Sequence, residues 1–196
     1  MKFIERLDLQ LIAIKDMFSV VKDNHMKIFI TNLAKYNEGI LKGEWISLPM
    51  DEKRLQSKIN NILGNDEEIF ITDYEAPIRI DEYENIADLN EFAEKLDGIQ
   101  ERDEVIEAIS KDVLGDGYSR EELIRILSER EYYVVEDVWT ESELAIKVEA
   151  SLLPFDYQAA EVAGISGYIN WDAVGRDMVM DGWNITGNGF AVKVYR

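Results

Sequence analysis

The sequence contains no cysteine and one histidine, His25, among its 196 residues. Without cysteine the chain has no disulfides, no thiolate metal ligands and no cysteine nucleophile. A single histidine does not form a histidine-based zinc site, and a Ser–His–Asp triad would depend on that one residue. We interpret the role of His25 as structural or incidental, and we expect neither a metal ion nor a cofactor.

Long hydrophobic runs are also missing. A bilayer-spanning helix needs about 20 predominantly apolar residues, whereas the longest uncharged run before Lys15 covers only residues 9–14. Acidic residues interrupt the first ten positions, and no small-residue cleavage site follows them. We therefore expect a cytoplasmic protein without a membrane partner.

Positive charge is scarce where negative charge is dense. The formal net charge is −19. Residues 65–149 hold 27 acids and 8 bases, whereas residues 1–64 hold 8 acids and 10 bases, and residues 150–196 hold 5 acids and 3 bases. So negative a chain repels phosphates, which excludes nucleic acid as a direct partner and favours a basic protein.

Apolar spacing predicts a small α+β unit at the start of the chain. Residues 3–22 carry apolar side chains every three or four positions, which indicates an amphipathic helix. We predict strands over residues 27–33, 44–48 and 68–74. Between them, Asp51 is placed to cap a helix that ends near Leu63, with Gly64 as its stop.

After residue 85 the apolar period becomes helical. One face continues to residue 109, with a break near Gly98. Two capping boxes, Ser119 with Glu122 and Thr140 with Glu143, predict helix starts. We also predict a strand over residues 132–135 and a closing hairpin over residues 183–195.

Acids recur through the helical stretch at steps of three or four residues, from Glu84 to Glu107. A helix would gather most of them on one side, with neighbours about 5–6 Å apart, a scale similar to phosphates along a DNA strand. Such series are usually solvated faces, but like charges at this spacing cost about 0.2–0.5 kcal/mol per pair. Adaptation to high salt would place acids everywhere, yet both ends are nearly neutral. We favour a face aimed at a basic cleft.

Other chemistry is weakly supported. Residues 112–117 faintly resemble a calcium loop, but position 12 of that loop is Leu123 where glutamate is required. Gly187 and Gly189 lie in the predicted hairpin, with no helix after them to bind phosphate. A hydrolase with a carboxylate pair stays open, although nothing marks two of the forty acids.

Three strings of residues resemble the ArdA antirestriction family. The first is MKIFITNLAKYNEG at residues 26–39. The second combines Asp73-Tyr74-Glu75-x-Pro77 with Asp81-Glu82-Tyr83, Ile86 and Leu89-Asn90. The third is Tyr168-Ile169-x-x-Asp172-x-x-Gly175-Arg176-Asp177, similar to the family's antirestriction segment. Their order and rough spacing are kept.

The resemblance implies an α+β fold: an elongated chain of three small α/β or α+β domains with an acidic helical middle. On this basis we expect an N-terminal α+β domain over residues 26–82, an acidic helical domain over 83–130, and a C-terminal α+β dimerisation domain over 131–196. Residues 1–25 precede the family-like start and are expected to form a helical extension.

The implied function is antirestriction without catalysis. A homodimer would imitate bent B-form DNA and occupy the DNA site of Type I restriction–modification enzymes, on their methyltransferase core. Such proteins are typically carried by plasmids and conjugative transposons. The alternative is an acidic interaction module for another basic DNA-binding protein.

We predict two sets of site residues. The DNA-mimic carboxylates are Asp66, Glu67, Asp73, Glu75, Asp81, Glu82, Glu84, Asp88, Glu91, Glu94, Asp97, Glu101, Glu104 and Glu107. The antirestriction motif and dimer interface comprise Tyr168, Asp172, Gly175, Arg176 and Asp177.

Within the motif, we expect Gly175 to permit a tight backbone turn. Arg176 and Asp177 are expected to form ion pairs within the fold or across the dimer, and Trp171 and Tyr168 to belong to the core or interface. In the acidic stretch, which we define as residues 65–149, reversing Glu91, Glu94 and Asp97 together to Lys should weaken inhibition while leaving the fold intact.

Overall fold

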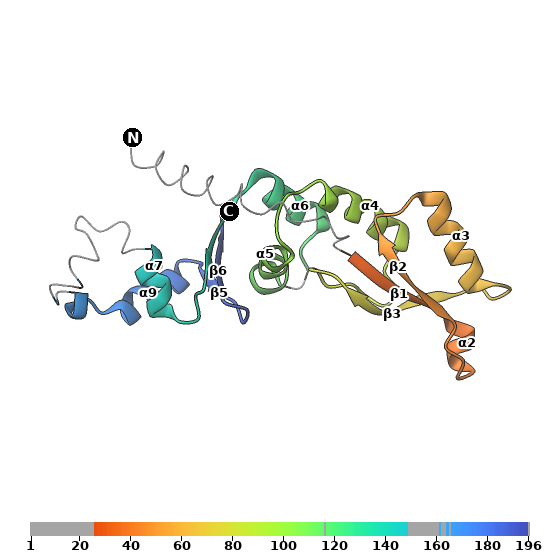
Figure 1. Ribbon diagram of the computed structural model, residues 1–196, viewed down its shortest axis with the longest axis horizontal. Coiled ribbons are helices and arrows are strands. Elements are labelled where there is room, and N and C mark those ends of the chain that lie inside the picture. Colours follow the sequence, from red (N-terminus) through yellow and green to blue (C-terminus); the bar gives the residue numbers. More distant parts are fainter. Residues whose placement is uncertain (1–25, 116, 149–160, 162–163, 165, 196) are drawn as a thin grey trace.

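The computed structural model describes residues 26–115, 117–148, 161, 164 and 166–195. It has a mixed α+β fold with two small antiparallel sheets (Figure 1). The helix predicted over residues 3–22, the extension 1–25 and His25 lie outside the described residues.

The first sheet confirms the three strands predicted near the start of the chain. Its order is β2 (Gly43–Leu48), β1 (Met26–Asn32) and β3 (Ile69–Glu75), with both pairs antiparallel. The short helix α2 (Leu33–Asn37) follows β1, and α3 (Glu52–Leu63) follows β2. As predicted, Asp51 caps α3 by accepting from the Arg54 amide at 3.1 Å, and Gly64 ends the helix at φ 64°.

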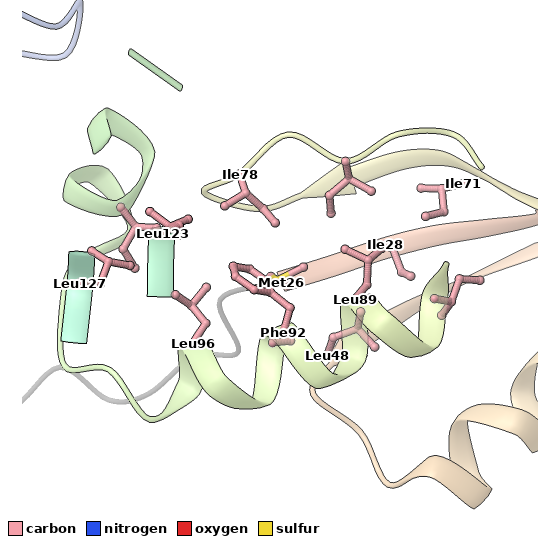
Figure 2. Packing of buried hydrophobic residues seen from close by; sticks show 14 of the residues in the cluster. Met26, Ile28, Leu48, Ile71, Ile78, Leu89, Phe92, Leu96, Leu123 and Leu127 are labelled. Carbon is pink, nitrogen blue, oxygen red and sulfur yellow. The ribbon is translucent and has the colours of Figure 1, made fainter. Parts of the chain in front are cut away.

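Alternation along β1 separates a covered face of the sheet from an open one. Met26, Ile28 and Ile30 are fully buried, whereas Lys27 is exposed and Phe29 half-buried. The covered face packs against α4 (Ile86–Asp97). Figure 2 shows Leu89 and Phe92 of α4 facing the side chains of β1.

The buried polar residue Asn32 joins three elements at the end of β1. Its side-chain oxygen accepts from the Lys35 amide at 2.9 Å and so caps α2. Its side-chain nitrogen donates to the carbonyls of Ile62 and Leu63 and to the Asp66 carboxylate, each at 3.0 Å. Asn32 therefore satisfies carbonyls that α3 leaves unpaired at its C-terminus.

The middle of the chain is helical, as predicted, but it bends. Asn85 caps α4 by accepting from the Ala87 amide at 2.9 Å, and the helix ends before Gly98. After a non-helical stretch, α5 (Asp103–Glu107) leads directly into a π-helix, η1 (Ala108–Leu114). The next helix, α6 (Arg120–Glu129), starts at Ser119, which accepts from the Glu122 amide at 3.1 Å.

The second sheet has the order β4 (Tyr132–Glu136), β6 (Phe190–Val194) and β5 (Asn184–Ile185), so the predicted strand and closing hairpin are confirmed. Beside it lie α7 (Glu141–Val148), the 3₁₀ turn η3 (Ser166–Tyr168) and α9 (Trp171–Met180). The capping box before α7 is reciprocal, because Thr140 and Glu143 each accept from the other's amide, at 3.2 and 3.1 Å.

Two hydrophobic clusters meet at β6. Phe190 and Val192 belong to the first cluster, which contains the first sheet and α4 to α6, whereas Ala191 belongs to a second cluster with α7 and α9. In Figure 1 the middle helices lie between the first sheet on the right and the second sheet on the left. The first cluster crosses the boundaries expected after residues 82 and 130, and the division into three domains stays a prediction.

None of the helices in the described part of the chain combines the length and the apolar composition that a bilayer crossing requires.

The expectation that Gly175 permits a tight turn is wrong. Gly175 is buried inside α9, where the helix crosses α7. A Cβ atom at Gly175 would lie 2.0 Å from the carbonyl oxygen of Glu141 in α7. The glycine therefore serves close helix packing, a requirement that the local sequence does not reveal.

Replacing Gly175 with Ala should force α7 and α9 apart. The new methyl group would overlap backbone atoms of α7, which cannot move aside by a change of rotamer as a side chain can. We expect a loss of about 1–3 kcal/mol in the free energy of unfolding, measured by urea denaturation. Gly187→Ala is the matched control, because nothing lies within 4 Å of a Cβ there. Equal stability of the two variants would contradict the packing role.

Candidate functional site

Glu84, one of the predicted mimic carboxylates, has a partner within the fold. It lies before α4 and accepts from Arg120 of α6 at 2.9 and 3.2 Å, with both side chains about a quarter exposed. Arg120 also donates to the Arg79 carbonyl at 2.6 Å, and its guanidinium lies 5.2 Å from the centre of the Phe92 ring. Glu84 therefore neutralises a cation that joins α6 to α4.

Glu101, another predicted carboxylate, also accepts hydrogen bonds within the fold. The hydroxyl of Tyr132 in β4 donates to its carboxylate, and the Arg102 amide donates to the other oxygen at 3.0 Å. Burial, and then the hydrogen bond to Glu101, raise the pKa of Tyr132 well above its usual range. The phenol stays protonated and acts as a donor, so Glu101 links the bend after α4 to the second sheet.

A second group of predicted carboxylates has surface partners. Lys side chains pair with Glu75, Glu91 and Glu107 at 3.2, 2.8 and 2.9 Å respectively. The hydrogen bond and charge of Lys95 lower the pKa of Glu91. The exposed pairs of Glu75 and Glu91 are worth about 0–1 kcal/mol and leave the carboxylate accessible, whereas Lys111, the partner of Glu107, is largely covered.

Two further predicted carboxylates accept hydrogen bonds from amides, and a third is half-buried. Asp66 accepts from the Asn32 side chain at 3.0 Å, and Asp73 from the Tyr74 backbone amide at 2.8 Å. Asp97 is half-buried at the end of α4.

The third group is exposed, and no Lys or Arg in the described residues pairs with it. Its members are Glu67, Asp81, Glu82, Asp88, Glu94 and Glu104. We call this group the free carboxylates. Glu68 and Glu121 are exposed too but were not among the predicted carboxylates, because Glu121 lies beyond the series that ends at Glu107 and no pattern marks Glu68.

The acids of α4 do not form a straight stripe along one side. In a helix of 3.6 residues per turn, a step of three falls short of a full turn by about 60°. Three such steps, from Asp88 to Asp97, carry the last carboxylate to the opposite side. This rotation separates Asp97, which is half-buried, from Asp88 and Glu94, which are exposed.

The C-terminal motif is largely at the surface. Tyr168 is 89 % exposed, and Asp172, Arg176 and Asp177 are exposed along α9. Tyr168 is therefore not a core residue, whereas Trp171 is half-buried against the second cluster. Among the described residues no ion pair involves Arg176 or Asp177, so pairing across a dimer stays a prediction.

Arg120 was not among the residues predicted from the sequence. The available signal was its rarity, because the acidic stretch holds only 8 bases.

In the part of the chain that the structure describes, no group of His, Asp and Glu side chains is arranged to hold a metal ion.

A comparison with protein-family models matches residues 28–192 to the model described as antirestriction protein (ArdA). The chain belongs to the ArdA antirestriction family. Membership implies an antirestriction function and binding to restriction–modification enzymes in general. A search of curated proteins found no match. The antirestriction segment expected at residues 168–177 falls inside the matched range, on η3 and α9.

Neutralising a carboxylate should reveal whether it serves the fold or the surface of this ArdA protein. Glu84→Gln removes the charge that Arg120 faces, and we expect a loss of about 1–3 kcal/mol in unfolding free energy. Glu94→Gln should change it by at most about 0.5 kcal/mol. Urea denaturation measures both, and a Glu84 variant as stable as the Glu94 variant would contradict the assignment.

Proposed function

We propose that this ArdA protein imitates B-form DNA and competitively occupies the DNA-binding site of Type I restriction–modification enzymes, on their methyltransferase core. The observation that carries the proposal is the set of free carboxylates, which gather between residues 67 and 104. Phosphates of duplex DNA are likewise anions fixed on a scaffold and exposed to a basic protein surface.

Rigid placement supports this function because an anion ordered beforehand loses little conformational entropy on binding. Asp88 and Glu94 stand on α4, whose other side buries Leu89, Phe92 and Leu96. Glu104 stands on α5, next to the buried Val105 and Ile106. The hydrophobic core thus holds the outward carboxylates in place.

Inhibition by this route is competition and needs no chemistry. Outside contact, Coulomb attraction decays over about 10 Å at 0.1 M salt, so the association is expected to be salt-sensitive. The low net charge of both ends confines that attraction to the middle of the chain.

The first experiment is a displacement titration. A labelled duplex is bound to a purified Type I methyltransferase core, and the protein is added at low and at high salt. We expect stoichiometric displacement that weakens as salt rises. No displacement by folded protein would overturn the proposal and leave another basic DNA-binding protein as the partner.

A variant assay locates the mimic surface. Neutralising three free carboxylates together, Asp88→Asn, Glu94→Gln and Glu104→Gln, should weaken displacement about tenfold, since each surface charge contributes about 0.5 kcal/mol. These positions replace the triple reversal expected from the sequence, because Glu91 pairs with Lys95 and Asp97 is half-buried.

The matched control removes the same charge elsewhere. Glu38→Gln, Glu52→Gln and Asp181→Asn are changes at exposed positions outside the acidic stretch. Glu38 and Asp181 pair with Lys35 and Lys193, but surface pairs contribute only about 0–1 kcal/mol, so the fold should be kept. The control triple variant should displace DNA like the unaltered protein. If both triple variants lose activity equally, net charge rather than a defined surface accounts for the inhibition.

The proposal includes a homodimer formed through the C-terminal part of the chain. What supports it is the exposed apolar side chains at the end of α9, Met180 at 79 % and Val179 at 36 %, together with the exposed Tyr168 of η3, which precedes the helix. Isolated exposed apolar residues are ordinary, but a helix that exposes several of them fits an interface.

Introducing a charge at this surface should weaken the dimer. For Met180→Lys we expect sedimentation equilibrium to give a dimer dissociation constant raised about tenfold or more, because a lysine would be buried without a partner. Leu41→Lys, at a 70 % exposed position in the first half of the chain, is the control. Unaltered association of the Met180 variant would place the dimer contact elsewhere.

A further inference from the structure

An open pocket lies between α3, β3 and the segment that leads into α4. Its volume is about 320 Å³, and its lining includes Gln56, Ile59, Phe70, Glu82 and Tyr83. The lining residues comprise two glutamates and no Lys or Arg. The pocket therefore combines an aromatic wall with negative charge and lacks a cation of its own.

Tyr83 forms the exposed part of the aromatic wall. Its ring stacks on Phe70, with ring centres 6.1 Å apart and planes at 22°, yet the residue is 70 % exposed. Tyr36 meets the same Phe70 ring edge-on at 5.2 Å. One face of the Tyr83 ring thus packs on a nearly buried aromatic, while the rest of the ring is open to a partner.

The backbone beside Tyr83 is held in place. The Glu82 carbonyl accepts from the Ile71 amide of β3 at 2.7 Å, and the Asp81 carbonyl accepts from the Glu84 amide at 3.1 Å. The first bond attaches the segment to β3, an edge strand of the first sheet, and the second closes a turn within the segment. An exposed ring that is already fixed adds little entropic cost to an interaction.

The charge in the pocket comes from Glu82. Of the two glutamates in the lining, Glu84 is neutralised by Arg120. Glu82 is exposed, and no described Lys or Arg pairs with it. One carboxylate thus stays available beside the open ring of Tyr83.

We infer that this pocket binds an arginine side chain of the protein's partner, with the guanidinium stacked on Tyr83 and donating to Glu82. The identity of the partner rests on the proposed function. A guanidinium is planar, weakly hydrated and able to stack on a ring while it bonds a carboxylate, whereas an ammonium is a strongly hydrated point charge. A surface that normally grips DNA phosphates supplies such arginines.

The same fold contains this chemistry internally. Arg120 places its guanidinium over the rings of Phe92 and Tyr118, at 5.2 and 5.9 Å, while it bonds the carboxylate of Glu84. Tyr83 and Glu82 offer the same pair of groups one and two positions before Glu84, but facing outward.

The test uses labelled hexaarginine and hexalysine peptides, which carry equal charge, in fluorescence anisotropy titrations of the full chain at two salt concentrations. We expect hexaarginine to bind about two- to fivefold more tightly than hexalysine. Tyr83→Leu should abolish that preference, and Glu82→Gln should reduce it. The matched control is Tyr133→Leu, which removes another stacked tyrosine, 55 % exposed, from the second sheet.

Two results would overturn the inference: no preference for arginine in the unaltered protein, or a preference that survives Tyr83→Leu. The DNA displacement assay then separates the two proposals. Tyr83→Leu should displace DNA less well with an unchanged salt dependence, because it removes no charge. If the unaltered protein fails to displace DNA but prefers arginine through Tyr83, the pocket stands and the proposed function fails.

Discussion

Packing of the apolar side of β1 against α4 is the contact on which the rest of the molecule depends. A chain with a net charge of −19 repels itself, and repulsion among the central acids alone could cost several kcal/mol. The core offsets this cost by burying Met26 and Ile28 against Leu89 and Phe92 (Figure 2), and it continues through α6 to β6. Since the same helices carry the outward acids, packing that stabilises the fold also fixes the charged surface.

The few bases of the acidic stretch are distributed unevenly. Arg120 and Lys111 are largely covered and join elements: Arg120 bonds Glu84 and the Arg79 carbonyl, and Lys111 bonds Glu107 and the Ala76 carbonyl. Cations used inside the fold do not neutralise its surface. The free carboxylates thus result both from the number of acids and from the positions of the bases, which pair within the fold.

Local patterns predicted the elements well because their signals lie within a few residues. Strand alternation at β1, the Asp51 cap and the reciprocal Thr140–Glu143 box all appear in the structure. What sequence could not predict depends on distant partners. The role of Gly175 is set by α7, and Glu84 is withdrawn from the surface by a residue 36 positions away. Asp97 stands apart from the other acids of α4 because steps of three residues rotate around a helix.

Charge and shape contribute differently to the proposed recognition. Long-range attraction from the free carboxylates would draw in any basic surface, so it raises the association rate without distinguishing a restriction enzyme from another DNA-binding protein. Discrimination needs short-range contacts that a wrong partner leaves unmade. A pocket for one guanidinium, with a fixed ring and one available carboxylate, is such a contact. A lysine ammonium can pair with the carboxylate, but it is not planar and does not stack on the ring as a guanidinium does. A protein that imitates DNA with charge alone would bind many basic proteins, and the aromatic wall at Tyr83 offers a way to prefer one of them.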